Sequence, residues 1–109
     1  MSLNQLANQC HTLAREKGWY DTKRELPELL CLIHSEISEA LEEYRQGHDP
    51  AKVYHHAGGK PEGVPIELAD AIIRILDICA HFGIDIDAAV AAKIGYNATR
   101  PYRHGNKVC

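Results

Sequence analysis

The chain has 109 residues, of which 45% are hydrophobic and 25% charged, and its formal net charge is -3. This length predicts a single domain covering residues 1–109, and the slight negative charge argues against general binding of nucleic acid. We expect a cytoplasmic protein without membrane contacts, because no apolar run approaches ~20 residues and the first residues lack a signal-peptide core. The four cysteines include no C-x-x-C pair, so we expect reduced thiols and no structural zinc site.

The first predicted helix covers about residues 3–17, where apolar residues recur at the i, i+3, i+4, i+7 spacing of an amphipathic helix. Asn4 is its candidate N-cap and Gly18 its candidate end. Trp19 and Tyr20 follow directly. One interpretation makes this aromatic pair a plug over the core, and the other makes it a stacking surface for a base.

The second predicted helix starts near Leu26 and is closed by Gly47. At about 100° per residue, Glu36 and Glu39 lie at the edge of its apolar stripe rather than opposite it. Glu43 falls between them in angle, one to two turns further on. These carboxylates are therefore expected to border the buried side of the helix.

Residues 48–64 are predicted to form a loop rich in Gly, Pro and His. No segment of the chain shows the alternation of a β-strand. Loops of this length are often functional or mobile in a small domain. His55 and His56 lie within it, and we interpret them as solvated loop residues rather than metal ligands.

The third predicted helix runs from about Pro65 to Phe82 and ends at Gly83. Its apolar face is broad, which indicates burial on more than one side, for example against another subunit. Its polar residues form one stripe, which by itself is typical of a solvent-exposed face. The members of this stripe are Glu67, Asp70, Arg74, Asp77 and His81.

The fourth predicted helix covers about residues 87–98, with Asp85 or Asp87 as its cap. Pro101 prevents it from continuing, and the tail of about residues 100–109 is expected to be irregular and basic. Four helices with short to medium links predict an all-α fold built as a four-helix bundle-type protomer.

Two acidic pairs carry the functional interpretation. Glu36 and Glu39 lie on the second helix, Glu67 and Asp70 on the third, and residues three apart in a helix are side by side. Four gathered carboxylates repel one another unless a cation binds, and ligand sets of oxygen alone suit Mg²⁺ or Mn²⁺. No Glu-x-x-His pair occurs, which disfavours a di-iron site. The alternative is that the pairs are merely solvated or salt-bridged.

Lys93, Asn97 and Arg100 share one face of the fourth helix at i, i+4, i+7. Lysine offers a mobile charge and arginine a bidentate fork for phosphate oxygens. The alternative is that the cations only complement the dipole at the helix C-terminus.

Four motifs follow one another over most of the chain. They are Glu36-x-x-Glu39, the loop Gly59–Gly63, Glu67-Leu-Ala-Asp70 and the segment from Lys93 to Gly105. Together they resemble the MazG-like nucleotide pyrophosphohydrolases of the all-α NTP pyrophosphatase superfamily. Dimeric dUTPases and phosphoribosyl-ATP pyrophosphatases are relatives of that family.

The resemblance implies Mg²⁺-dependent hydrolysis of a nucleoside triphosphate, an NTP or dNTP, between the α- and β-phosphates, giving a monophosphate and pyrophosphate. Mn²⁺ would be able to replace Mg²⁺. By position, the metal ligands and catalytic residues would be Glu36, Glu39, Glu67 and Asp70. One of these or a neighbouring carboxylate would position or deprotonate the attacking water.

The resemblance also implies a homodimer or homotetramer that oligomerises through its helices, with active sites near subunit interfaces. Contacts with the phosphates or sugar would come from Lys93, Asn97 and Arg100, with help from Arg103 and His104, while Trp19 is the candidate for the base. Many members of the family have a further Glu at the position of Ser35, and by helical angle Glu43 is the candidate substitute. The number of metal ions, one or two, is therefore open. The alternatives are a phosphoribosyl-ATP pyrophosphatase-like enzyme and a non-catalytic helical module for nucleotide binding or interaction.

Overall fold

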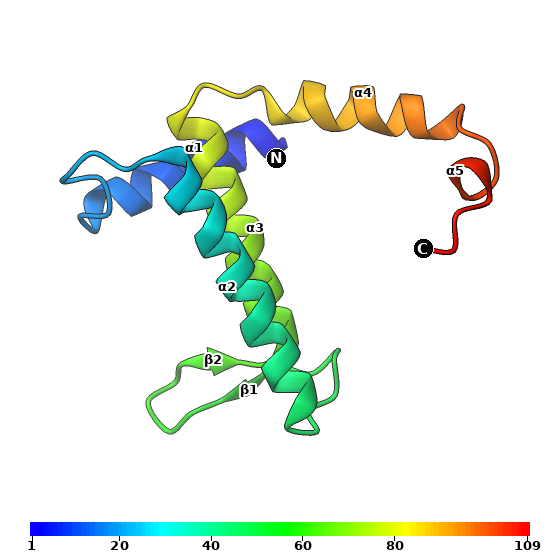
Figure 1. Cartoon of the computed structure of the whole chain (residues 1–109). Helices are drawn as coiled ribbons and strands as arrows, with labels where there is room; N and C mark the ends of the chain where they lie inside the picture. The colour runs from blue at the N-terminus through cyan, green and yellow to red at the C-terminus, as the bar shows by residue number, and fades with distance from the viewer.

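The computed structural model describes all 109 residues and is mostly helical, as the sequence predicts (Figure 1). The elements in chain order are α1 (Leu3–Glu16), α2 (Leu26–Arg45), β1 (Tyr54–His55), β2 (Pro61–Glu62), α3 (Val64–His81), α4 (Ile86–Ala98) and α5 (Arg103–Asn106). The four main helices begin and end within two residues of their predicted limits, because Pro and Gly residues mark their ends. None of the helices combines the length and apolar character needed to cross a bilayer.

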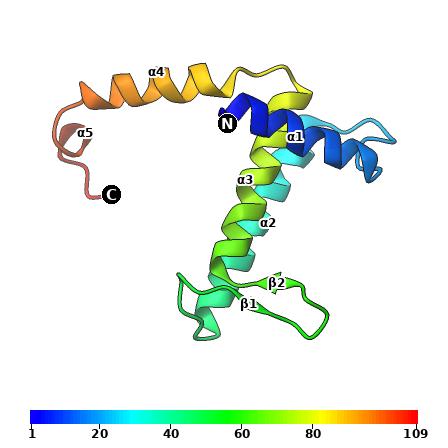
Figure 2. The same cartoon turned by 180° about the vertical axis from the view of Figure 1, so that it is seen from behind.

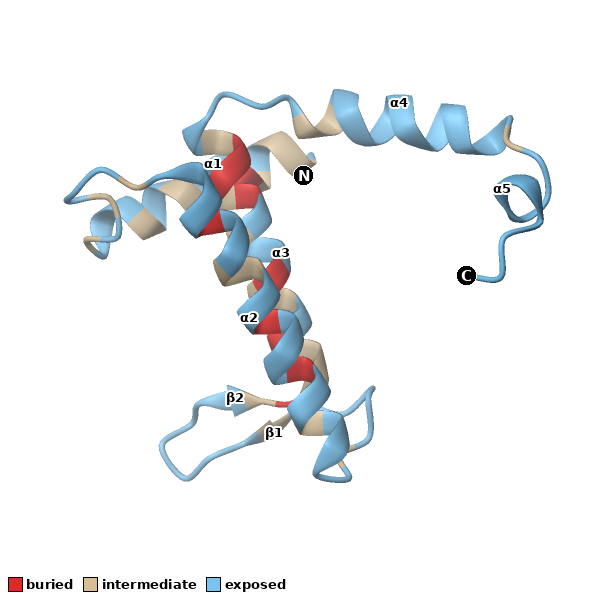
Figure 3. Cartoon of the chain, in the orientation of Figure 1, coloured by how far each residue is buried: buried red, intermediate tan, exposed pale blue.

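Helix α3 is the centre of the packing (Figures 1 and 2). It runs antiparallel to α2 along most of its length and also packs against α1, which crosses near its C-terminal end. The buried apolar residues follow these two contacts (Figure 3). They are Ala7, Leu29, Ala40, Ala71, Leu76, Ile78 and Cys79.

The predicted fourth member of the bundle, α4, extends away from the other helices (Figures 1 and 3). It contacts α1 only near its own start, and none of its residues is buried. Three helices therefore pack in this protomer, and a four-helix bundle is not assembled within it. The reason is that α4 leaves the α2–α3 pair after the turn at Gly83 and is tied instead to the beginning of α1.

Helices α1 and α4 are joined at their N-terminal ends, where a side chain of each helix accepts hydrogen bonds from backbone N–H groups of the other. Ser2 is the N-cap of α1, in a capping box with Gln5, so the prediction of Asn4 as this cap is wrong. Asn4 Oδ1 accepts a hydrogen bond from the backbone N–H of Ile86 at 3.0 Å, while Asp87 accepts from the N–H of Asn4 at 3.0 Å. Each helix thus satisfies free N–H groups of the other.

The loop between α2 and α3 contains a small antiparallel hairpin, which the sequence did not predict. Tyr54 pairs with Glu62 and His55 with Pro61. Two residues per strand are too few to show an alternating pattern. Gly63 follows the hairpin with φ +123°, and an added Cβ there would lie 2.6 Å from the carbonyl oxygen of Lys52. The hairpin is therefore anchored tightly at the start of α3.

The α2–α3 pair exposes a broad apolar surface. On each helix most of the exposed apolar residues recur at spacings of three, four or seven residues, so they form one stripe. The members of the two stripes are Leu30, Ile37, Leu41 and Tyr44 on α2, and Leu68, Ile72 and Ile75 on α3 with Phe82 directly after it. By helical angle, both stripes lie on the flank of the pair away from Glu39 and Asp70. This exposed surface agrees with the broad apolar face that the sequence pattern of α3 predicts.

Candidate functional site

Most of the polar stripe of α3 faces inward rather than towards solvent, an alternative that the sequence pattern left open. Glu67 is 8% exposed, and the side chain of Asp77 is 16% exposed. Arg74 Nε donates a hydrogen bond to Glu36 Oε1 on α2 at 2.7 Å. The stripe is therefore the polar seam along which α3 meets α1 and α2.

Three of the predicted ligands meet in this seam. Carboxylate oxygens of Glu36, Glu67 and Asp70 all lie within 4.8 Å of one another. They meet because α2 and α3 run antiparallel in close contact, which brings their acidic pairs together. Glu36 and Glu67 are among the ten buried residues of the chain. Buried carboxylates normally have partners, and here a single arginine, Arg74, forms an ion pair with Glu36.

Glu67 is the most perturbed member of the cluster. Its Oε2 atom is buried and has no hydrogen-bond partner. Burial raises its pKa from an ordinary value of 4.5 to about 7, and a hydrogen bond with Glu39 and the charges of Glu39, Asp70 and Glu36 act in the same direction. Burial and the charge of Glu36 likewise raise the pKa of Asp70, against the opposing charge of Arg74. Each shift therefore reflects first the burial of the carboxyl and then the neighbouring carboxylates.

Glu39 completes the predicted set of four. It is exposed, yet close enough to share a hydrogen bond with Glu67. The oxygen-only donors, the orphaned oxygen of Glu67 and the accumulated negative charge together fit a hard divalent cation such as Mg²⁺. Ser35 takes no part, because it is exposed and its hydroxyl donates to the carbonyl oxygen of Leu32 at 2.6 Å.

A second group of carboxylates adjoins the first. Oxygens of Glu43, Glu62 and Glu67 also lie within 4.8 Å of one another. The sequence suggested Glu43 by angle but gave no signal for Glu62, which reaches the group from β2. His56 has a largely exposed side chain and His55 is exposed, which agrees with their interpretation as solvated residues.

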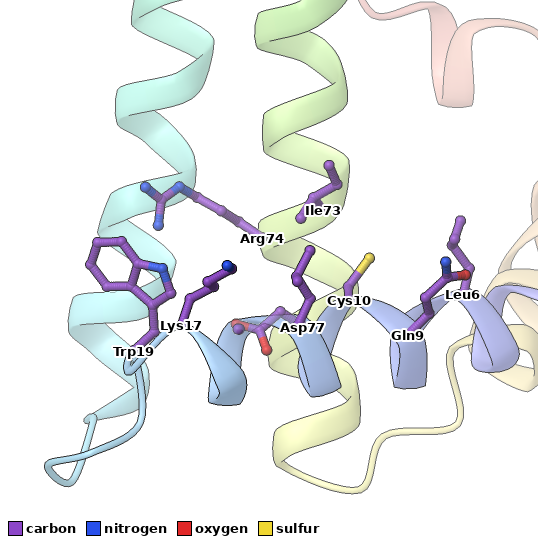
Figure 4. Close-up of a pocket in the computed structure, with 10 residues that line it drawn as sticks. Leu6, Gln9, Cys10, Lys17, Trp19, Ile73, Arg74 and Asp77 are labelled. Carbon is purple, nitrogen blue, oxygen red and sulfur yellow. The ribbon is translucent and has the colours of Figure 1, made fainter.

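A cavity of about 450 Å³ lies beside the first cluster, between α1, α3 and the segment that follows α1 (Figure 4). Its lining residues are Leu6, Gln9, Cys10, Leu13, Ala14, Lys17, Trp19, Ile73, Arg74 and Asp77. Arg74 connects it to the carboxylates, since the same side chain binds Glu36. Trp19, which is 61% exposed, borders the opening rather than plugging the core.

Tyr20 has a structural role over the core, which is one of the two roles that the sequence suggested for the pair of Trp19 and Tyr20. Its hydroxyl donates to Asp77 Oδ2 at 2.7 Å, and its ring stacks on His81 with centroids 4.2 Å apart. His11 Nδ1 lies 2.7 Å from the other oxygen of Asp77. Burial and the hydrogen bond with Asp77 raise the pKa of Tyr20, so its hydroxyl stays a donor. This network joins α1 to α3 behind the cavity.

The predicted phosphate-binding residues do not reach the carboxylates within one protomer. They all lie on α4 and the tail, namely Lys93, Asn97, Arg100, Arg103 and His104, and α4 projects away from the α2–α3 pair (Figure 1). Lys93 and Arg100 instead lie over the ring of Tyr96, at 4.9 and 5.7 Å from its centroid. The basic residues and the carboxylates are therefore separate within an isolated protomer.

No protein-family model matches the chain, and no curated protein or solved structure matches it either. The candidate site is thus defined by its own geometry. Of the predicted residues, the structure brings together Glu36, Glu39, Glu67 and Asp70, and places Trp19 at a cavity beside them. The cationic residues of α4 lie apart.

Proposed function

We propose that this chain is a Mg²⁺-dependent nucleoside triphosphate pyrophosphohydrolase of the MazG-like kind. It hydrolyses an NTP or dNTP between the α- and β-phosphates to a nucleoside monophosphate and pyrophosphate. The observation that carries the proposal is the cluster of Glu36, Glu67 and Asp70, in which both glutamates are buried and Glu67 has an unpartnered oxygen. The resemblance of the acidic and basic motifs supplies the reaction type.

Glu36, Glu39, Glu67 and Asp70 are the residues that would hold Mg²⁺, with Mn²⁺ as a substitute. When bound, the cation neutralises the triphosphate, polarises the phosphorus and lowers the pKa of a coordinated water. Arg74 holds Glu36 in place through its 2.7 Å bond. The cluster would be repulsive without a cation, which is the physical reason for assigning one.

In the reaction, the water oxygen bonds to the α-phosphorus, and the bond from that phosphorus to the α–β bridging oxygen breaks. Pyrophosphate leaves with the bridging oxygen, and a carboxylate accepts the proton of the water. We assign this carboxylate to Glu39, because it is the exposed member of the cluster and so meets solvent water. Glu36 and Glu67 are buried beneath it.

The cavity beside α1 is the proposed site of the nucleoside. A volume of about 450 Å³ lies within the usual range for small-molecule sites. Trp19 at its edge offers an aromatic face on which a base can stack. Arg74 lies between the cavity and Glu36, so a nucleoside in the cavity would direct its phosphates towards the carboxylates.

The phosphate-binding residues are proposed to come from a second copy of the chain. Lys93 and Asn97 lie on α4, which has no buried residue of its own, and Arg100, Arg103 and His104 follow it in the chain. Apolar residues of α4, among them Ile94 at 64% exposed, lack partners, as do the exposed stripes of α2 and α3. Association into a homodimer or homotetramer would bury these surfaces and bring the cations to a neighbour's carboxylates.

The experiment is to measure pyrophosphate release from a panel of NTPs and dNTPs, with Mg²⁺ and with EDTA. Glu39→Ala and Asp70→Ala should each lower the rate by more than about 100-fold, because even the outer partners of metal ligands contribute 10–100-fold. Glu42→Ala, on the exposed side of α2, is the matched control and should keep full activity. Circular dichroism should show unchanged helix content in all three variants.

Two outcomes would contradict the proposal. If no nucleotide is turned over, the chain is a binding module rather than an enzyme. If activity survives both Glu39→Ala and Asp70→Ala, the metal ligands have been assigned to the wrong residues.

A further inference from the structure

Trp19 combines an exposed side chain with a backbone that is fixed in place. Its side chain is 61% exposed at the edge of the cavity of about 450 Å³ beside α1 (Figure 4). Its backbone N–H donates to the carbonyl oxygen of Ala14 at 3.1 Å, and its own carbonyl oxygen accepts a hydrogen bond from Arg24 Nη1 at 3.1 Å. Both backbone groups of Trp19 are therefore paired, although the residue lies outside any helix.

These two bonds connect Trp19 to α1 and to α2. Ala14 belongs to the last turns of α1. The side chain of Arg24 is 15% exposed, and its Nη2 donates to Glu28 Oε1 in the first turn of α2 at 2.8 Å. Arg24 thus bridges the carbonyl group of Trp19 to the start of α2.

Tyr20 supplies a third connection, to α3. Its hydroxyl donates to Asp77 Oδ2 at 2.7 Å, and His11 Nδ1 lies 2.7 Å from Asp77 Oδ1. A carboxylate only accepts hydrogen bonds, so both neighbours are donors to it. The ring of Tyr20 lies between two histidines, with centroids 4.9 Å from His11 and 4.2 Å from His81. Tyr20 is therefore fixed at its hydroxyl and at its ring.

Asp77 lines the cavity, but its oxygens already have partners within the chain. Its side chain and that of His11 are each 16% exposed, and His11 is the basic side chain that pairs with it. Apolar groups of the same shape would join α1 to α3 about as well, because a buried polar pair adds little net stability over them. Hydrogen bonds of defined direction instead specify one arrangement of the elements that they join.

We propose that Tyr20, Asp77 and His11 are positioning residues for the nucleoside site, which fix the segment after α1 so that the indole of Trp19 stays at the edge of the cavity. Consecutive Cα atoms are about 3.8 Å apart, so the attachment of Tyr20 to α3 also restrains Trp19. An aromatic side chain that is already in place loses less conformational freedom when a ligand binds, which increases affinity. The base as ligand rests on the proposed function, whereas the restraint on Trp19 does not.

The first test uses fluorescence without nucleotide. Trp19 is the single tryptophan of the chain, so its emission reports on this segment alone. Tyr20→Phe removes one hydroxyl group and keeps the ring. In time-resolved measurements on the full chain, this variant should lose part of the residual anisotropy of Trp19, because the indole gains motion on the nanosecond timescale.

Two further variants accompany this measurement. Asp77→Asn leaves one acceptor oxygen for two donors, so it should also lower the anisotropy of Trp19. Tyr54→Phe is the matched control, because it breaks an equivalent contact between a tyrosine hydroxyl and a carboxylate, that of Glu43 at 2.9 and 3.0 Å, away from the cavity. It should keep the wild-type anisotropy. Circular dichroism and urea unfolding should establish that each variant is folded.

The second test is a kinetic comparison of single and double variants. Tyr20→Phe should raise KM for the nucleotide about three- to tenfold with kcat nearly unchanged, as expected for the loss of one hydrogen bond that acts on binding. In the Trp19→Ala background, Tyr20→Phe should raise KM no further, because its effect passes through the indole. A purely structural role of Tyr20 would make the two effects multiply.

Each result decides a different question. If Tyr20→Phe and Asp77→Asn both keep the wild-type anisotropy, the positioning role is overturned whatever the kinetics show. If the anisotropy falls but the effects of Tyr20→Phe and Trp19→Ala on KM multiply, the network restrains Trp19 and its role in the nucleoside site is overturned. If the wild-type chain turns over no nucleotide, the proposed function fails, and the anisotropy alone decides whether the network positions Trp19.

Discussion

Arg74 Nε lies 2.7 Å from Glu36 Oε1 and joins α3 to α2 in the middle of the polar seam. The same arginine lines the cavity beside α1, so one side chain contacts both the carboxylate cluster and the proposed nucleoside site. It is the only arginine or lysine that forms an ion pair with Glu36, Glu67 or Asp70.

We predict that Arg74→Gln destabilises the protein in EDTA by about 1 kcal/mol, because the arginine is partly exposed and such pairs contribute modestly. Mg²⁺ should restore most of the loss, since a cation can replace the missing positive charge. Thermal unfolding with EDTA and with Mg²⁺ measures both effects. Arg24→Gln, which breaks the ion pair with Glu28 and touches none of the clustered carboxylates, should show no dependence on Mg²⁺. An equal response of the two variants would argue against a cation beside Glu36.

The raised pKa of Glu67 predicts a dependence of stability on pH. Its pKa is about 7 in the folded chain and near the ordinary 4.5 when unfolded, so the folded state binds more protons between these values. Stability in EDTA should therefore be greatest below about pH 4.5 as far as Glu67 is concerned, and should fall as pH rises to 7. The measurement is the difference in unfolding free energy between wild type and Glu67→Gln from pH 5 to 8.

Mg²⁺ is the control for this pH dependence. A bound cation stabilises the ionised carboxylate, so the loss of stability above pH 6 should shrink when Mg²⁺ is present. Binding of Mg²⁺ should likewise tighten as pH rises from 6 to 8. A pH profile that is the same for wild type and Glu67→Gln would show that Glu67 is not perturbed.

Trp19 is expected to affect nucleotide binding more than chemistry. Trp19→Ala should raise KM about tenfold with little change in kcat, because stacking on a base is worth about 1–3 kcal/mol. Trp19→Phe should restore most of the affinity. Steady-state kinetics of pyrophosphate release measure this, and an unchanged KM in Trp19→Ala would place the base outside the cavity.

The separation of α4 from the carboxylates predicts complementation between copies. Lys93→Ala/Arg100→Ala and Asp70→Asn should each be inactive as pure proteins. Co-expressed, they should recover about a quarter of wild-type activity, because half of randomly assembled dimers contain one intact composite site out of two. No recovery above either parent would mean that α4 does not act on a second copy.

Gly63 predicts a purely structural effect. Gly63→Ala should cost about 1–3 kcal/mol, because φ is +123° and the new Cβ would lie 2.6 Å from the backbone oxygen of Lys52. Gly58→Ala in the same hairpin loop is the matched control, since its backbone is ordinary and no atom lies within 4 Å of the added Cβ. Urea unfolding compares the two, and equal stabilities would contradict the tight approach at Gly63.

Local patterns predicted the helices well. Pro27 and Pro65 mark helix starts and Gly18, Gly47 and Gly83 mark ends, because these residues act through backbone geometry within one turn. The acidic pairs were also recognisable, since a spacing of three places two side chains on one face of any helix. Cap choice was less certain: Asn4 has the right chemistry, but it is used to cap α4 from a distance.

The sequence by itself therefore determined the helical class, the helix limits and the four carboxylates of the two pairs, all of which depend on neighbours within a few residues. The tertiary structure decided the rest. It turned the polar stripe of α3 inward against α1 and α2, brought Glu62 from the hairpin to the carboxylates, and placed Lys93 on α4 and Arg100 just beyond it, apart from these groups. These outcomes depend on how segments distant in the chain cross one another, and no local spacing contains that information.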